Sequence, residues 1–173
     1  NQFPEDPNSS YDHAIFGDVA AGLKILAIIN GPPADAGGAI DFANWRAYVE
    51  AIVTRRSESA EGGQELNYRD AIAAWEIGNE EGLPDYAILT SEGYLQILRD
   101  TCDILYEYGQ GDKPILLGSP LPTVWENLNS HEKWNQVIIG IQNDRVNNER
   151  YGTLRDCLDT VGLHVYNEPR KSR

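Results

Sequence analysis

The chain has 173 residues, of which 27 are Asp or Glu and 14 are Lys or Arg, so its formal net charge is −13. A surface this acidic repels phosphate groups, which excludes nucleic acid and anionic membranes as partners. Hydrophobic residues make up 41% of the chain, and its longest apolar run, Ile25 to Ile29, is too short to cross a bilayer.

The length fits one domain, and no internal boundary is expected within residues 1–173. The chain begins with Asn and contains no Met, which predicts a processed or incomplete polypeptide. No segment resembles a signal peptide. The glycosylation triplet Asn8-Ser9-Ser10 favours a secreted or extracytoplasmic location.

The first half of the chain predicts a helix, a strand and a second helix. After a start rich in Pro and Ser, YDHAIFGDVAAG has apolar residues at helical spacing and ends on Gly22, a typical residue after a helix. LKILAIING then predicts an almost entirely apolar strand, of the kind found in parallel sheets that are covered on both faces. Residues 42–58 predict a helix with one apolar face, and residues 61–70 predict a loop.

The second half continues the alternation. AIAAWEIG predicts a strand, and Thr90 or Ser91 can cap a helix that ends at Gly109. The buried side of that helix is expected to carry Leu95, Leu98, Cys102, Leu105 and Tyr106. KPILLGSP predicts the next strand, WNQVIIGIQNDRV a helix and DTVGLHVY the last strand.

Strands that alternate with helices predict an α/β fold with a parallel sheet. Two such folds compete, the doubly wound sheet and the (β/α)8 barrel. The chain lacks the phosphate-binding patterns GxGxxG and GxxxxGK[ST], whereas polar or turn residues follow all four predicted strands, which favours the barrel. A barrel needs eight strands and at least about 200 residues. The chain is therefore expected to be part of a barrel, completed by further sequence or by a partner.

The segment AWEIGNEEG carries the clearest chemical signal. Strand alternation places Glu76, Gly78 and Glu80 on one face and Trp75, Ile77 and Asn79 on the other. If the first face is the barrel interior, Glu80 lies at the mouth and Glu76 lies deeper. A Glu at an apolar barrel mouth can have its pKa raised, as a proton donor to a glycosidic oxygen requires.

WEIGNE at the end of an apolar strand resembles the fourth strand of the large clan of retaining (β/α)8-barrel glycoside hydrolases, which includes cellulase-like, β-xylosidase-like, arabinofuranosidase-like and heparanase-like enzymes. GLKILAIINGPP is similar to the clan's third strand and VGLHVY to its sixth, so the resemblance covers strands three to six. It implies that Glu80 is the general acid/base and that Asn79 holds the sugar 2-hydroxyl. It also implies that His164 and Tyr166 line the sugar site.

The chain departs from the clan in one respect. The resemblance implies a nucleophilic Glu at the tip of strand seven, and no candidate for strands one, two, seven or eight is present. Glu168 is a poor substitute, because it follows the sixth strand and a retaining pair needs carboxyl groups about 5–5.5 Å apart.

Other residues have simpler interpretations. Asn30, at the tip of the first predicted strand, and Trp125, in a loop, are further candidates for sugar contact, whereas Trp75 is expected in the core and Trp134 is a weaker platform. Glu76 is expected in the barrel interior beside a polar neighbour, and Glu81 is expected to be exposed. His13 and His131 lack partners at metal-ligand spacing, so we expect no metal and no cofactor. Two buried free thiols, at Cys102 and Cys157, are favoured over a disulfide.

The sequence thus predicts a retaining glycoside hydrolase of poly- or oligosaccharides, with the remaining strands supplied by the same or another chain. Two alternatives stay open. One is a half-barrel that binds carbohydrate without catalysis, and the other is a different barrel enzyme that uses Glu80 as a proton-transfer base.

Overall fold

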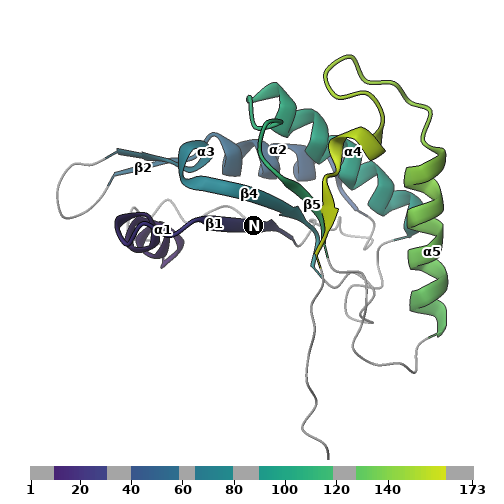
Figure 1. The fold of residues 1–173 in the computed structure, drawn as a ribbon, viewed down its shortest axis with the longest axis horizontal. Coiled ribbons are helices and arrows are strands. Elements are labelled where there is room, and N and C mark those ends of the chain that lie inside the picture. Colours follow the sequence, from purple (N-terminus) through teal and green to yellow (C-terminus); the bar gives the residue numbers. More distant parts are fainter. Residues whose placement is uncertain (1–9, 31–39, 59–64, 80–89, 119–127, 163–173) are drawn as a thin grey trace, which may run out of the picture.

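The fold is built on a four-stranded parallel sheet. The computed structural model describes residues 10–30, 40–58, 65–79, 90–118 and 128–162. The strands are β1 (Ile25–Ile29), β4 (Ile72–Ile77), β5 (Ile115–Leu117) and β6 (Thr160–Val161), and they lie in the order β1-β4-β5-β6 (Figure 1). All three pairings are parallel. The predicted α/β fold with a parallel sheet is therefore confirmed, and neighbours in this sheet follow one another along the chain.

A long helix precedes each of these strands: α1 (Ser10–Ala20), α2 (Phe42–Val53), α4 (Ser91–Glu107) and α5 (Leu128–Asn143). Gly22 and Gly109 follow α1 and α4 with φ angles of 73° and 69°, so the predicted glycine ends are confirmed. Thr90 caps α4 by accepting a hydrogen bond from the Gly93 N–H at 3.0 Å.

The hydrophobic core lies between one face of the sheet and the helices α2 and α4 (Figure 1). It contains Trp45 and Val49 of α2, Leu98 and Leu105 of α4, and Trp75 and Ile77 of β4, all at most 1% exposed. The predicted buried side of α4 is correct for Leu98, Cys102 and Leu105 but wrong at its two ends. Leu95 and Tyr106 are only partly buried, whereas Tyr94 and Ile97 are buried in their place.

The segment after α2 differs from the prediction of one helix and a loop. The helix ends at Val53, where the Thr54 N–H and Oγ1 both donate to the Glu50 carbonyl, at 2.9 and 2.7 Å. Strand β2 (Arg56–Glu58) then pairs antiparallel with β3 (Glu65–Asn67), followed by the short helix α3 (Tyr68–Ala71). The apolar spacing that predicted the helix stops at Val53, and the polar residues beyond it follow the hairpin instead.

Arg55, which lies between the end of α2 and the start of β2, holds this segment in place through a buried ion pair. Its guanidinium donates to both carboxylate oxygens of Asp12 in α1, at 2.8 and 2.5 Å, and the Tyr68 hydroxyl also donates to Asp12. Desolvation and the Asp12 charge raise the pKa of Tyr68, so the phenol stays protonated as the donor. The cluster joins α1 to the end of α2 and the start of α3.

Two further differences occur near the last strand. Helix α5 begins at Leu128, six residues before its predicted start at Trp134. The four-residue helix α6 (Leu154–Cys157) was not expected; the side chains of Thr153 and Asp156 form a capping box at its start. Of the predicted strand 159–166, β6 covers Thr160–Val161, and the residues after Gly162 lie outside the described part of the chain.

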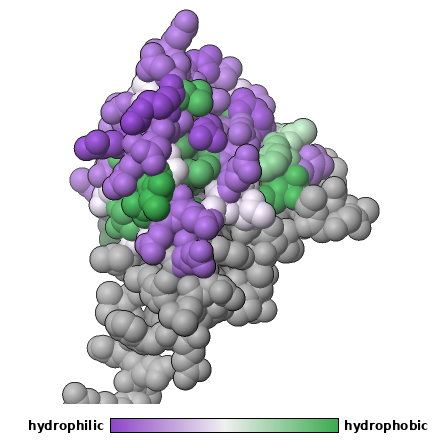
Figure 2. Space-filling view, turned by 90° about the vertical axis from the view of Figure 1, so that its right-hand side faces the viewer, coloured by the Kyte–Doolittle hydropathy of each residue, from purple (hydrophilic) through white to green (hydrophobic). Residues whose placement is uncertain are grey.

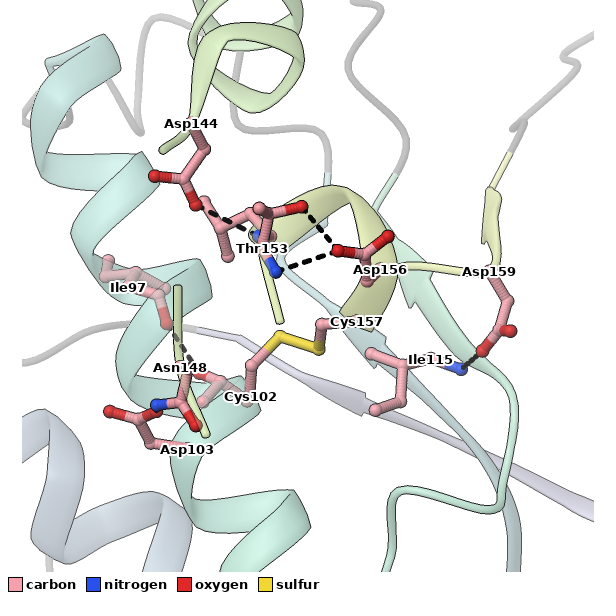
Figure 3. The surroundings of a disulfide bond; sticks show 12 residues. Ile97, Cys102, Asp103, Ile115, Asp144, Asn148, Thr153, Asp156, Cys157 and Asp159 are labelled. Atoms are coloured by element: carbon pink, nitrogen blue, oxygen red, sulfur yellow. Dashed lines mark hydrogen bonds between the residues drawn. A yellow bond between two sulfur atoms is a disulfide. The ribbon is translucent and has the colours of Figure 1, made fainter. Parts of the chain in front are cut away.

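The expectation of two free thiols is wrong. Cys102 in α4 and Cys157 in α6 form a disulfide, with their Cα atoms 6.3 Å apart (Figure 3). Both residues are at most 1% exposed. The two cysteines face each other because α6 packs on α4, and the pattern of the sequence did not predict α6 at all.

The sequence predicted a sheet that is covered on both faces. Among the described residues this cover is missing at β1, on the face opposite α2 and α4. Leu26 and Ile28 of β1 are 46% and 47% exposed, while Ile29 on the helix-covered face is 1% exposed. Around α5 the surface is mostly hydrophilic, with hydrophobic residues in separate patches (Figure 2). No helix in the described ranges combines the length and the apolar character that a bilayer span requires.

Candidate functional site

The carboxyl ends of the four parallel strands meet along one edge of the sheet. Three hydrogen bonds, each 2.8 Å long, cross this edge: Gly78 N–H to Ile29 O, Gly118 N–H to Ile77 O and Gly162 N–H to Leu117 O. Each donor is the glycine that directly follows a strand. The residues that directly follow β1, β4, β5 and β6 therefore lie level with one another at this edge. Parallel sheets commonly bind their ligands at this edge.

Glycine is required at this edge for two different reasons. Gly78 has a φ of 82°, a backbone conformation that residues with a Cβ adopt rarely. A Cβ added at Gly118 would lie 2.2 Å from the Gly78 carbonyl oxygen, which is a backbone atom and cannot rotate away. The tip of β5 can approach the Gly78 carbonyl this closely because Gly118 carries no side chain.

The alternation of side chains between the two faces of β4, which the sequence predicted for residues 75–80, stops at Gly78. Trp75 and Ile77 do face the helices, and Glu76 faces the opposite side, as predicted. A positive φ is outside the strand region, however, so the two-residue alternation ends at Gly78. It does not fix the directions of Asn79 or Glu80.

Asn30 and Asn79 are the two predicted site residues within the described ranges. Asn30 directly follows β1 and Asn79 lies two residues after the end of β4, on neighbouring strands of the sheet. Both are partly buried, and the Oδ1 atom of Asn79 is buried. Each side-chain amide offers donors and an acceptor, which suits a ligand rich in hydroxyl groups.

The other predicted site residues, Glu80, Trp125, His164 and Tyr166, lie outside the described residues, as does Glu168. The structure thus brings Asn30 and Asn79 to one edge, and the predictions for the other four stay predictions. Trp75 is fully buried on the helix-covered face, as expected for a core residue, and Trp134 packs partly buried against the core.

Glu76 lies beneath this edge. It is 2% exposed, and it is in register with Ile28 of β1 and Leu116 of β5. Its Oε1 atom lies 2.6 Å from the position that a Cβ on Gly162 would occupy. The carboxylate of β4 therefore reaches across β5 to the end of β6. The burial of Glu76 agrees with its predicted inward position, whereas the barrel interior itself stays a prediction. Only its closeness to Gly162 relates it to a second strand end.

Tyr94 is a residue that the sequence analysis did not connect with the site. Its hydroxyl donates to the Ile77 carbonyl at 2.8 Å, so α4 holds the end of β4 from the helix side. A Tyr one turn after the Thr90 cap is the only sequence signal for this role, and it is not specific.

Lys113 has a structural role at the opposite end of the sheet. Its ammonium group donates to the carbonyls of Arg69 and, at 2.7 Å, Ile72, the first residue of β4. Desolvation lowers its pKa, but its position at the amino end of β4 separates it from the candidate site. Within the described residues, no three His, Cys, Asp or Glu side chains gather as metal ligands would, and His13 is exposed on α1.

No family model and no curated protein sequence matches the chain.

Proposed function

We propose that the chain forms strands three to six of a (β/α)8 barrel and supplies the acid/base Glu80 of a retaining glycoside hydrolase. The observation that carries this proposal is the position of the segment WEIGNE. Its strand, β4, lies inside a parallel sheet and delivers Asn79 to the carboxyl edge beside the tip of β1. In barrel enzymes this edge carries the active site.

The strand order supports a barrel over a doubly wound sheet. A doubly wound sheet reverses its strand order and has helices on both faces. The four described parallel strands run in chain order without a reversal, and α2 and α4 lie on one face. The opposite face exposes Leu26 and Ile28, apolar side chains of the type that fill a barrel interior.

In the proposed reaction, Glu80 first donates a proton to the glycosidic oxygen that leaves, while a nucleophilic carboxylate attacks the sugar. Glu80 then removes a proton from the water that hydrolyses the glycosyl intermediate. Asn79 binds the sugar 2-hydroxyl, and Asn30, Trp125, His164 and Tyr166 complete the sugar site. The nucleophile and the remaining strands come from sequence outside these residues, in the same or another chain. No cofactor or metal takes part.

The disulfide is consistent with a protein that functions outside the reducing cytosol, because such bonds persist mainly in oxidising compartments. We therefore propose a secreted or extracytoplasmic enzyme that acts on poly- or oligosaccharides.

The test compares Glu80→Gln with Glu81→Gln in the protein expressed at the full length that its gene encodes. Hydrolysis is measured on aryl β-glucoside, aryl β-xyloside and aryl α-arabinofuranoside and on polysaccharides. Loss of a general acid/base costs about 10²–10⁴-fold in rate. We expect this loss for Glu80→Gln and wild-type rates for the adjacent Glu81→Gln. The loss should be smaller for dinitrophenyl glycosides, whose leaving groups need little protonation.

Equal rates for the wild type and both variants would contradict the assignment of Glu80. Binding of oligosaccharides in calorimetry without any hydrolysis would favour the alternative, a half-barrel that binds carbohydrate.

A further inference from the structure

The peptide unit that joins Ile77 to Gly78 is hydrogen-bonded on both sides of β4. Its N–H, on Gly78, donates to the Ile29 carbonyl of β1 at 2.8 Å. Its carbonyl oxygen, on Ile77, accepts the Gly118 N–H from the end of β5, also at 2.8 Å. The Tyr94 hydroxyl of α4 donates to the same oxygen at 2.8 Å. Two strands and one helix therefore meet on this one peptide unit.

Tyr94 reaches this carbonyl from a fixed place in the helix layer. It lies in the first turn of α4, where its N–H donates to the Thr90 carbonyl at 2.9 Å, and it is 3% exposed. A buried phenol hydroxyl costs free energy unless it forms a hydrogen bond, and the Ile77 carbonyl provides one. The hydroxyl thereby connects the packed side of α4 with the end of β4.

The conformation of Gly78 depends on the orientation of this peptide unit. Glycine adopts positive and negative φ angles with similar ease, and Gly78 has a φ of 82°. A flip of the Ile77–Gly78 peptide unit would change this φ with little movement of the neighbouring Cα atoms. It would also break all three hydrogen bonds, so each of them favours the observed conformation. The bond from Tyr94 is the one that a side-chain substitution can remove.

We propose that Tyr94 is a positioning residue of the candidate site, which holds the Ile77–Gly78 peptide unit in the orientation that places Asn79 at the carboxyl edge. Asn79 directly follows Gly78, so the conformation of Gly78 sets where the Asn79 side chain starts. The inference rests on the proposed function, in which Asn79 binds the sugar 2-hydroxyl. A displacement of about 1 Å in an active site can cost about 10²-fold in rate.

The experiment compares Tyr94→Phe with Tyr68→Phe in the full-length protein. Each substitution removes one hydroxyl and keeps the aromatic ring, and both tyrosines are buried. Tyr68 donates to Asp12 and lies in α3, which precedes the amino end of β4, away from the candidate site. Both variants should lower the thermal midpoint by at least about 2 °C, because each loses a buried hydrogen bond.

The two variants should differ in activity. Measured well below the thermal midpoint, kcat/KM for the aryl glycosides should fall about 10–100-fold in Tyr94→Phe and stay at the wild-type value in Tyr68→Phe. Wild-type kcat/KM in Tyr94→Phe, with a lowered midpoint, would overturn the inference and make Tyr94 a structural residue.

A second substrate shows whether the loss passes through Asn79. An aryl 2-deoxyglycoside lacks the hydroxyl that Asn79 binds in the proposed reaction, so the effect of Tyr94→Phe on kcat/KM should shrink to less than about twofold. For the same reason Tyr94→Phe/Asn79→Ala should be no slower than Asn79→Ala alone on the ordinary glycoside. Equal losses on both substrates, or additive losses in the double variant, would contradict the inference.

Hydrogen exchange separates this inference from the proposed function and from a general loosening of the sheet. The Gly78 and Gly118 amides both depend on the same peptide unit, whereas the Gly162 amide donates to Leu117. Tyr94→Phe should speed exchange at Gly78 and Gly118 about tenfold and leave Gly162 unchanged, and the control variant should change none of the three. Equal acceleration at all three amides, or at none, would overturn the inference.

The failure of the proposed function would be visible separately. A wild-type protein that neither binds nor hydrolyses glycosides would end the proposed function. The exchange rates would still decide whether Tyr94 holds the peptide unit that leads to Asn79.

Discussion

At the scale of single residues, the glycines of the carboxyl edge set how closely the strands approach. Gly78 supplies a positive φ and Gly118 supplies space beside the Gly78 carbonyl. Sequence alone predicted polar residues after each strand, and it placed Glu76 and Trp75 on the correct faces. It did not predict the turn at Gly78, because a glycine between Ile77 and Asn79 is compatible with both an extended and a positive-φ conformation.

We expect Gly118→Ala to destabilise the protein by about 1–3 kcal/mol, because its Cβ would overlap a backbone oxygen that can move only with the strand. Gly17→Ala is the matched control. Gly17 lies in the exposed side of α1 with no atom within 4 Å of its added Cβ, so the change should stabilise by about 0.5–1 kcal/mol. Urea unfolding of both variants measures the difference, and equal free energies of unfolding would contradict this interpretation of Gly118.

At the scale of elements, long segments with apolar periodicity and a glycine after them were predictable. Helices α1 and α4 end where Gly22 and Gly109 indicated, and the central strands lie where apolar runs indicated. The hairpin β2–β3 and helix α6 were missed because each is too short to show a period. The disulfide was missed for the same reason, since it depends on α6 packing against α4.

Asp144 connects the end of α5 with the start of α6. Its carboxylate accepts the Leu154 N–H at 3.0 Å and the Val146 N–H at 3.2 Å, and Arg99 lies 3.4 Å away (Figure 3 shows the contact to α6). Burial alone would raise the pKa of Asp144, but the two backbone N–H groups and the Arg99 charge lower it below its usual value.

We therefore expect Asp144→Asn to lower the free energy of unfolding at pH 7 by about 1–3 kcal/mol. Because the pKa is lower in the folded state, the contribution of the carboxylate is present above the unfolded pKa of about 3.9 and is lost as the pH falls through the folded pKa. The gap between wild type and variant should thus narrow in acid. Urea unfolding at several pH values measures it. The exposed Asp112→Asn is the control, and a gap that stays constant with pH would contradict the role of the charge.

At the scale of the whole molecule, one face of the described sheet is covered by helices, and the other, the open face, is exposed at β1 although Glu76 of β4 is buried there. Helices α2 and α4 cover the first, while β1 and β6 are the two edges of the described sheet and Leu26 and Ile28 lie exposed on the second. The sequence predicted a parallel sheet from the alternation of elements, but the exposure of individual side chains in β1 depends on what packs against the sheet, which no local pattern encodes.

Leu26→Ser tests whether further strands cover the open face in the full-length protein. A covered Leu26 should cost about 2–5 kcal/mol when truncated, whereas an exposed one should cost less than about 0.5 kcal/mol. We expect the larger value. Leu23→Ser, at a site 60% exposed just before β1, is the control and should be close to neutral. If chemical unfolding finds both variants close to neutral, the open face is solvent-facing and the proposed barrel is wrong.

The disulfide between Cys102 and Cys157 also determines the covalent connectivity of the molecule. It closes a loop across a sequence separation of 55 residues, and in the chain-entropy treatment such a loop stabilises the fold by about 4 kcal/mol. Because β5 and α5 lie inside this loop, a protease that cut one peptide bond between the two cysteines would not divide the protein into two molecules. The part that carries β4 and the part that carries β6 would stay joined through sulfur until a reductant released them.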